Sequence, residues 1–412
     1  MTASNILDIR KNSIGIDSGI FDNREWVQGI VDILGDVIGM ENGPVGLHEP
    51  LFLDRESEYL SECLKTREVS STGRFISEME NRLREITGCA GAILVGNGTV
   101  GLQVSLTAAG VGQGHEVLVP ALTFVAAANA VVHCGATPHL VDVSEENLGV
   151  DAVRLEEYLA ENCDLTENGA RNRSTGRVIR ALLVVHTFGH PPDMDALAQI
   201  CRNWNMVMVE DGAEALGSTC RGRHCCTTGL VGIVSFNGNK IITTGGGGAV
   251  LTMDPQLATE LRDLISTARI PHRWEIAHTT AAFNFRLPNL NAALGMAQLD
   301  RFEKILDVKR RLAAEYESHF SGYVGLKFLK EPEYARSNYW LNALILDREM
   351  ASQRDEVLEK TNDSGFGTRP AWIPMHFLPM YSSVPRMDLR VTEDMAARIV
   401  NLPSGPGILW EK

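Results

Sequence analysis

Several patterns that would assign a sequence to a common class are missing from these 412 residues. No apolar run approaches the roughly 20 residues that a membrane-spanning helix needs. The N-terminus has no basic segment followed by an apolar one, as a secretory signal would have. There is no basic stripe either, because 38 Lys and Arg stand against 52 Asp and Glu, a formal net charge of −14. Nucleic acid is therefore an unfavourable partner, and we expect a cytoplasmic protein.

The cysteine motifs that bind metals and the glycine-rich P-loop motif are missing as well. None of the eight cysteines forms a C-x-x-C pair, and no Cys/His spacing matches a zinc site. We therefore expect reduced thiols and no bound metal. The sequence has no G-x-x-x-x-G-K-[ST] pattern. This absence argues against a P-loop.

What is present is an ordinary globular composition, with 44% hydrophobic and 22% charged residues. The length suggests a large α/β domain with a smaller companion, or two to three domains. We predict an N-terminal extension over residues 1–45, a large domain over 46–305 and a small C-terminal α+β domain over 306–412. In the extension, Trp26, Ile30, Leu34 and Ile38 recur at helical spacing. They predict one amphipathic helix over 23–39 that docks on the main body.

From about residue 75 to 255, short β-branched runs alternate with helical patterns. The predicted strands are 91–96, 115–120, 137–143, 181–188, 206–210, 231–236 and 248–253. This alternation predicts a mostly parallel sheet covered by helices on both faces. Residues 289–320 predict one long helix towards the small domain, with Lys304, Lys309, Arg310 and Arg311 on its outer turns.

Ligands of open parallel sheets bind beyond the carboxyl ends of the strands, so polar residues there are the candidates. Gly98 and Thr99 open a helix, where free N–H groups suit a phosphate, although a turn capped by Thr99 explains them too. Asp211 ends an apolar strand and could pair with a buried cationic nitrogen or cap a helix. Lys240 precedes the apolar residues Ile241 and Ile242. Burial there would favour the neutral amine, which can attack a carbonyl. A lysine with a purely structural role would give the same pattern.

Together these residues indicate more than each does alone. A phosphate nest, an aromatic ring at Phe124, the acid Asp211 and the amine of Lys240 are the parts of a pyridoxal-phosphate pocket. In such a pocket the phosphate anchors the cofactor and the aromatic side chain stacks on its ring. The acid keeps the pyridine nitrogen protonated, and the lysine binds the aldehyde.

The sequence resembles the DegT/DnrJ/StrS family of pyridoxal-phosphate-dependent sugar aminotransferases from about Leu47 to Gly407. The segments that carry the resemblance include NGTVGLQVSL, VVHTFGHPPDMDAL, VEDGAEALGS, VSFNGNKIITTGGGGAVLT, FNFRLPNLNAALGMAQL and TRPAWIPMHFLPMY. Within the family, FNGNKIITTGGGG, IPHRWE and SNYWLN look most like the LegC-type branch. The resemblance implies fold type I, with a mostly parallel central sheet, helices on both faces and a smaller C-terminal α+β domain.

The resemblance also implies a role for each matching residue. Lys240 matches the catalytic lysine, Asp211 the acid at the pyridine nitrogen, and Glu214 the residue beside the ring oxygen. The other cofactor-binding matches are Thr99, Val100 and Ser235 at the phosphate, Phe124 at the ring, and Asn284 at the phosphate of the neighbouring subunit. His376 matches the approach to the sugar. Independently of the family, Arg273 lies in a segment whose guanidinium groups could bind a diphosphate.

We therefore expect an aminotransferase that uses pyridoxal 5'-phosphate and acts as a homodimer with shared active sites. The branch implies transfer from glutamate to C4 of a nucleotide-linked 4-keto-6-deoxy sugar of the UDP-N-acetylhexosamine type. Alternatives are a dTDP-, GDP- or CDP-linked keto-sugar, or a free sugar acid. A sugar dehydratase would replace Lys240 with histidine, and a non-catalytic paralogue would be expected to lose Lys240, Asp211 or Ser235. Three departures from the family pattern, Gly212, Leu230 and residues 279–282, concern the substrate rim.

Overall fold

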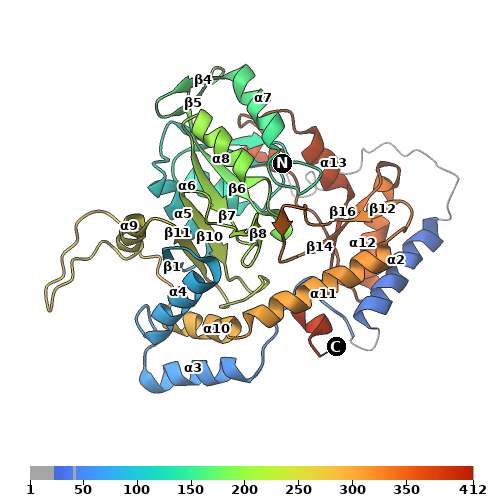
Figure 1. Ribbon diagram of the computed structural model, residues 1–412, viewed down its shortest axis with the longest axis horizontal. Helices are drawn as coiled ribbons and strands as arrows, with labels where there is room; N and C mark the ends of the chain where they lie inside the picture. The colour runs from blue at the N-terminus through green and yellow to red at the C-terminus, as the bar shows by residue number, and fades with distance from the viewer. Residues whose placement is uncertain (1–22, 40–42, 412) are drawn as a thin grey trace.

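A computed structural model describes residues 23–39 and 43–411 (Figure 1). In these ranges the central sheet runs in the order β1-β11-β10-β7-β6-β2-β3, with the β4–β5 hairpin beside β6. Its strands are β1 (Gly91–Val95), β2 (His115–Pro120), β3 (Thr137–Val141), β4 (Cys163–Thr166), β5 (Gly169–Asn172), β6 (Val178–Val185), β7 (Val207–Asp211), β10 (Val231–Ser235) and β11 (Gly248–Thr252). Within the described ranges, no helix is long and apolar enough to cross a bilayer.

The helices follow the predicted alternation with the strands. They are α2 (Asn23–Ile38), α3 (Asp54–Thr66), α4 (Arg74–Thr87), α5 (Gly98–Ala108), α6 (Ala126–His133), α7 (Ala152–Asn162), α8 (Met194–Asn203), α9 (Pro255–Ile265), α10 (Asn289–Leu299), α11 (Phe302–Phe320), α12 (Arg354–Asp363) and α13 (Arg390–Arg398). Short 3-10 turns lie at η3 (Thr187–Gly189), η4 (Arg348–Gln353), η5 (Met375–Phe377), η6 (Pro379–Tyr381) and η7 (Pro406–Leu409).

The sheet is mostly parallel, as predicted. Strands β10, β7, β6, β2 and β3 pair in parallel, whereas β11 is antiparallel to both of its neighbours. No crossover helix joins β10 to β11; residues 236–247 form a loop instead, and parallel pairing would require a longer crossover. Alternate residues of β1 enter different apolar clusters: Ile93 and Val95 on one face, Ala92 and Leu94 on the other. Both faces are thus covered.

The hairpin of β4 and β5 was not predicted. It extends the sheet because β5 pairs antiparallel with β6. Gly169 begins β5 with φ +137, and a Cβ there would lie 2.2 Å from the carbonyl oxygen of Ile179. Only glycine tolerates both that backbone conformation and that approach.

The smaller C-terminal part has its own sheet, in the order β12-β14-β16-β15. Its strands are β12 (Leu326–Phe328), β14 (Asn342–Leu346), β15 (Arg369–Pro370) and β16 (Ile399–Leu402). A further small sheet crosses between the two parts and contains β8 (Thr219–Cys220), β9 (Arg223–His224) and β13 (Ala335–Arg336). We propose the division at residues 305 and 306 on the basis of the two main sheets.

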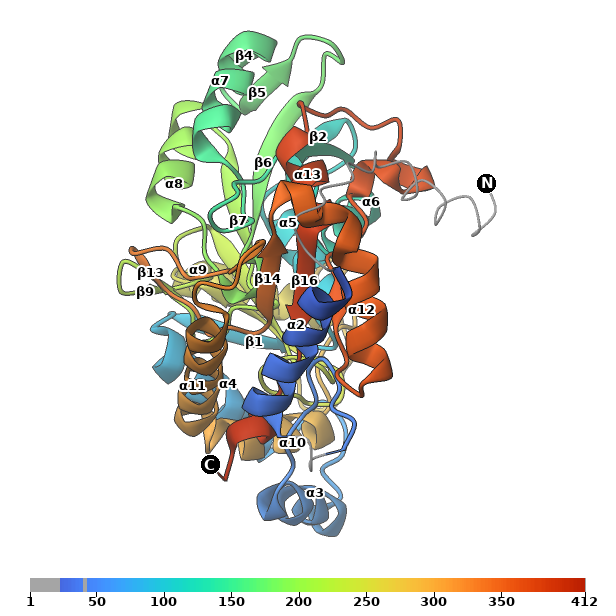
Figure 2. The same ribbon diagram turned by 90° about the vertical axis from the view of Figure 1, so that its right-hand side faces the viewer.

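The predicted amphipathic helix is confirmed as α2. It buries Trp26, Ile30, Leu34 and Ile38 in one cluster with residues of α11 and β14. The indole N–H of Trp26 donates to the carbonyl of Val324 at 2.7 Å. Figure 2 shows α2 lying along α12, so its docking surface is the small C-terminal part. Residues 1–22 and 40–42 of the predicted extension lie outside the described residues.

The prediction of one long helix over 289–320 is wrong, because α10 and α11 separate at Asp300 and Arg301. Arg301 has φ −121 and ψ 19, outside the helical range. Its guanidinium pairs with the buried carboxylate of Glu56 on α3, which also accepts from Gln298. These contacts with a distant helix override the local helical pattern.

Lys309 was expected on an outer turn of this helix, and its side chain is instead fully buried. Its Nζ lies 3.0 Å from His48 Nε2 and donates to the carbonyls of Trp340, at 3.1 Å, and Ser404, at 2.5 Å. Burial lowers the pKa of Lys309 well below its usual range. The amine thereby links His48, in the segment before α3, to the residues just before β14 and just after β16.

Replacing Lys309 should therefore destabilise the protein. Lys309→Ala should lower the free energy of unfolding by roughly 3–5 kcal/mol, since it opens a cavity and leaves buried carbonyls without a donor. Lys309→Met keeps most of the volume and should cost roughly 1–3 kcal/mol. Urea denaturation measures both. The matched control is Lys327→Ala, an exposed lysine whose loss should stay within about 0.5 kcal/mol; equal effects at the two positions would contradict the interpretation.

Candidate active site

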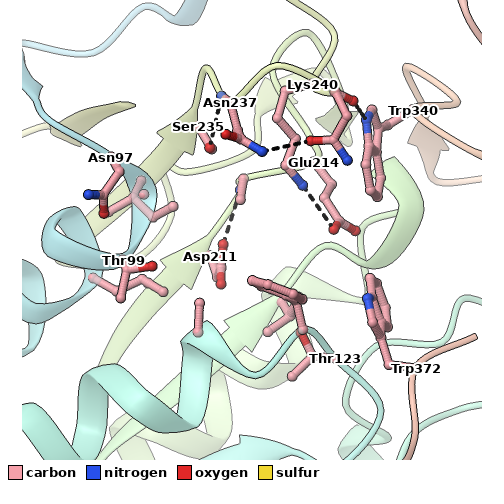
Figure 3. A pocket seen from close by; sticks show the side chains of 18 residues that line it. Asn97, Thr99, Thr123, Asp211, Glu214, Ser235, Asn237, Lys240, Trp340 and Trp372 are labelled. Atoms are coloured by element: carbon pink, nitrogen blue, oxygen red, sulfur yellow. Dashed lines mark hydrogen bonds and ion pairs between the residues drawn. The ribbon is translucent and has the colours of Figure 1, made fainter. Parts of the chain in front are cut away.

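A cavity of about 350 Å³ opens where β7 and β10 end and α5 begins (Figure 3). Its polar side chains come from the carboxyl ends of the strands and from the residues that follow them, where ligands of such sheets bind. They are Asn97, Thr99, Thr123, Asp211, Glu214, Ser235, Asn237, Asn239 and Lys240. Aromatic side chains line it as well, namely Phe124, Trp340 and Trp372.

Lys240 lies in the loop that joins β10 to β11. Its Nζ donates to Glu214 Oε1 at 3.2 Å and lies 3.8 Å from the centre of the Trp340 ring. The side chain is only 13% exposed. Among the described residues that line the cavity, Lys240 carries the single cationic side chain. The structure therefore brings the predicted amine into the cavity, and it is not a solvated lysine.

Two carboxylates face this amine from the β7 side. Asp211 is the last residue of β7, and its Oδ1 accepts the N–H of Ala213 at 3.1 Å. Glu214 accepts the backbone N–H of Phe188 at 2.9 Å, besides its bond from Lys240. Burial raises the pKa of both Asp211 and Glu214, and the charge of Lys240 opposes that shift. Phe188 has φ 56, a conformation that a bulky residue adopts only where its surroundings enforce it.

The N-terminus of α5 forms the opposite end of the cavity. Asn97 caps the helix, because its Oδ1 accepts the N–H of Val100 at 3.0 Å. The backbone N–H of Val100, expected at a phosphate, thus bonds to Asn97 in this structure. The N–H groups of Gly98 and Thr99 belong to the first turn of α5, where no carbonyl of the helix can accept them. A Cβ at Gly98 would lie 3.2 Å from Ser235 Cβ, so a side chain there would fill the space between them. The result is a narrow, N–H-lined cradle suited to an anion.

Comparison with known proteins agrees with this geometry. The model of the DegT/DnrJ/EryC1/StrS aminotransferase family matches residues 52–412. The chain belongs to this family. It is a pyridoxal-phosphate-dependent aminotransferase.

Individual relatives cover nearly the whole chain. The GDP-perosamine synthase of Caulobacter vibrioides is 35% identical over 369 residues, covering 88% of this chain and 94% of the relative. The GDP-perosamine synthase of Escherichia coli O157:H7 is 33% identical over 368 residues, covering 89% and 95%. Among solved structures, the aminotransferase TlmJ from Streptoalloteichus hindustanus has 30% identity and a TM-score of 0.78, covering 88% of this chain and 94% of that one. The LegC-type branch is not confirmed.

The residues of the cavity fit the cofactor of this aminotransferase family. The cradle at Gly98, Thr99 and Ser235 offers N–H and hydroxyl donors for a phosphate, and the buried carboxyl of Asp211 would supply the acid that a pyridine nitrogen needs. Phe124 is 55% exposed although it is a large apolar residue, which leaves its ring face available for stacking. When bound, the cofactor supplies an electron-withdrawing ring that stabilises charge on the substrate carbon.

Trp340 and Trp372 were not assigned a role from the sequence. Trp340 lies in the segment SNYWLN and Trp372 in TRPAWIP. Both segments carry the family resemblance, but the resemblance implies no role for either tryptophan. Both indoles border the cavity, and Phe188 packs between them with ring centres 6.5 Å and 5.1 Å away. Their signal in the sequence was a tryptophan beside a C-terminal strand, Trp340 just before β14 and Trp372 just after β15, which periodicity alone assigns to the core.

His376 was expected at the sugar, and the structure places it outside the cavity. Its Nε2 bonds to Glu393 on α13 at 3.0 Å, and its ring packs on Phe377 with centres 4.1 Å apart. Burial lowers the pKa of His376. The neighbouring N–H of Met375 donates to the carbonyl of Ala121 at 2.9 Å. His376 thus holds α13 near the strand end that leads to Phe124, and Trp372 reaches the cavity from the same segment.

Asn284 and Arg273 also lie outside the cavity of their own chain. Both belong to the stretch 266–286, which projects from the body between α9 and α10 (Figure 1). Isolated bridges between Ser266 and Asn284, and between Arg269 and His278, fold it into a ribbon. Residues 269–281 are exposed throughout. The departure from the family pattern at 279–282 lies on this ribbon.

The other two departures have local explanations. Leu230 precedes β10 at its amino end, opposite the cavity, so it does not form the substrate rim. A Cβ at Gly212 would lie 2.1 Å from Cys226 Sγ, so the alanine common in the family would not fit beside this cysteine. The glycine and the cysteine are a matched pair beneath Asp211.

His186, Glu210 and Cys226 are buried with potential ligand atoms within 4.8 Å of one another. The carboxylate of Glu210 is already saturated by hydrogen bonds. It accepts from His186 and from the backbone N–H groups of Cys226, Thr228 and Gly229 at 2.6–3.0 Å. Glu210 therefore acts as a clamp on the loop before β10, rather than as a metal ligand.

Proposed function

We propose that this aminotransferase transfers an amino group from glutamate to C4 of a nucleotide-linked 4-keto-6-deoxy sugar. The observation that carries the proposal is the lining of the cavity, where the amine of Lys240 is the single cationic group among the described residues, beside neutral polar, aromatic and aliphatic side chains and two acids. A neutral sugar ring suits such a lining, because aromatic faces pack on its C–H groups and amides bind its hydroxyls. A strongly anionic reacting centre would need further cations.

In this proposal the site residues would take the roles that the family resemblance implies. Lys240, whose amine Glu214 holds at 3.2 Å, would bind the cofactor aldehyde and move the proton at the substrate carbon. Asp211 would supply the acid for the pyridine nitrogen, and Phe124 the face for its ring. Thr99 and Ser235 would hold the phosphate. The retention of Lys240 in the cavity weighs against a dehydratase, which would carry histidine there.

For the nucleotide we favour GDP over the UDP that the branch resemblance implied. The support is the pair of GDP-perosamine synthases that match at 35% and 33% identity over nearly the whole chain. A nucleoside is discriminated by hydrogen bonds to the edge of its base, since a wrong base leaves buried polar groups unpaired.

The diphosphate of a nucleotide sugar needs cationic donors, and Lys240 is the only cationic side chain among the described residues that line the cavity. We therefore expect the other donors on a second copy of the chain. Arg273 and Asn284 are exposed on the projecting ribbon and reach nothing in their own cavity. In our proposal the protein is a homodimer, in which the ribbon places Asn284 at the partner's cofactor phosphate and Arg273 near the partner's substrate diphosphate. The exposed apolar residues Ile270, Trp274 and Ile276 on the ribbon suit such an interface.

The first test concerns Lys240. Borohydride reduction of the cofactor-loaded protein should fix the cofactor on Lys240, as found by peptide mapping. Lys240→Ala should lose amino transfer by at least about a thousandfold, because one amine both binds the cofactor and moves the proton. Lys327→Ala, an exposed lysine, controls for the loss of charge. Recovery of the cofactor on another lysine would overturn the assignment.

The second test concerns the nucleotide. Enzyme, glutamate and GDP-, UDP- or dTDP-linked 4-keto-6-deoxy sugars are incubated separately, and the amino sugar is measured by mass spectrometry. We expect kcat/KM for the GDP-linked sugar to exceed the others by roughly tenfold or more, because mispaired base edges cost that much. Lys240→Ala gives the background rate for each sugar. Turnover of the UDP-linked sugar alone would refute the GDP assignment and leave the aminotransferase assignment standing.

The third test concerns the shared site. Lys240→Ala and Asn284→Ala chains, each inactive alone, are co-refolded with different tags. Random pairing should restore up to about a quarter of wild-type activity, because half of the dimers are mixed and each of those keeps one intact site. Sedimentation gives the oligomeric state. A fully active monomer, or purified mixed dimers without activity, would refute the proposal.

A further inference from the structure

The segment Ser337–Trp340, called the SNYW loop below, comes from the small C-terminal part and is tied to the loop that carries Glu214. Asn338 is fully buried, and its Nδ2 donates to the carbonyls of Glu214 and Leu216, both at 2.9 Å. Its backbone N–H donates to Ser218 Oγ at 2.9 Å. One amide side chain thus fixes the backbone from which the Glu214 carboxylate reaches Lys240.

Trp340 ties the same loop to Lys240 itself. Its indole N–H donates to the carbonyl of Asn239, the residue before the lysine, at 2.7 Å. The face of its ring lies 3.8 Å from Lys240 Nζ. Figure 3 shows the indole beside the amine, on the side away from Ser235 and Thr99. The ring cannot turn without breaking the bond to Asn239.

The backbone of Trp340 is held on both sides. Its N–H donates to Asn338 Oδ1 at 2.8 Å, and its carbonyl accepts from the buried amine of Lys309 at 3.1 Å. Tyr339 between them has φ 47, an unfavourable conformation for an aromatic residue. Such strain persists only where the surroundings determine the conformation, and it gathers at functional sites.

We propose that Trp340 is a positioning residue for Lys240, which the SNYW loop holds between the indole face and the Glu214 carboxylate. The proposal rests on the proposed role of Lys240. An ammonium group is attracted to an indole face, so this contact restrains the amine and fixes its direction. The Glu214 carboxylate holds the amine from the other side through a bond of 3.2 Å. The small C-terminal part thereby governs how readily the amine reacts.

The reactivity of Lys240 can be measured without substrate and without turnover. The apoprotein is treated with a trace of isotopically labelled acetic anhydride at fixed pH, and acetylation of Lys240 is compared with that of exposed Lys327 by mass spectrometry. Trp340→Leu removes both the ring and the indole N–H, so acetylation of Lys240 should rise roughly threefold to tenfold as the contact is lost. Trp340→Phe retains a ring and should give an intermediate rate.

Trp372→Phe is the matched control, since Trp372 also borders the cavity but has no contact with Lys240 in the described structure. Its Lys240 acetylation should remain within about twofold of wild type. Circular dichroism and the Lys327 rate show whether each variant is folded. A folded Trp340→Leu protein with wild-type Lys240 reactivity would refute the proposal, as would an equal rise in Trp372→Phe.

A second readout uses the cofactor-loaded protein. The pH midpoint of the bound cofactor's absorption band should shift in Trp340→Leu and less in Trp340→Phe, with kcat reduced more than KM is changed. An unshifted midpoint in folded Trp340→Leu would contradict the positioning role. If borohydride fixed the cofactor on another lysine, the proposed function would fail, and the acetylation contrast on the apoprotein would still report whether Trp340 positions Lys240.

Discussion

The ion pair between Lys240 and Glu214 joins the parts of the chain that form the cavity. Its atoms lie 3.2 Å apart in a setting where burial disfavours an isolated charge on either group. Each partner is fixed from elsewhere: Glu214 by the N–H of Phe188 and by Asn338, and Lys240 by the turn after β10 and by Trp340. Loss of one partner would leave the other buried and uncompensated. The loops around the pair must therefore keep a single arrangement.

The alternation of strands and helices and the cluster at the strand ends could be predicted from the sequence, because both follow from local patterns. Periodicity locates buried faces, and a parallel sheet brings the ends of β7 and β10 together. Asp211, Ser235 and Lys240 therefore came together in the structure as expected. The β4–β5 hairpin was missed because its turn, Glu167-Asn168, carries no glycine or proline signal and no long alternating apolar run flanks it.

What could not be predicted depends on contacts between residues far apart in the chain. Lys309 looks like an exposed lysine until His48 and two carbonyls surround its amine. The break before α11 requires Glu56, from a helix more than two hundred residues earlier. His376 does not line the cavity, and its ring bonds to Glu393 on α13 instead. Local sequence carries no signal for such partners.

The helix α2 lies outside the segment that the family model matches, yet it belongs to the hydrophobic core of the C-terminal part. The family match starts at residue 52, whereas α2 ends at Ile38. Yet α2 contributes Trp26, Ile30 and Leu34 to the same apolar cluster as α11 and the C-terminal sheet. The segment that the family model matches and the hydrophobic core therefore do not share a boundary, and a cut at residue 52 would divide that core.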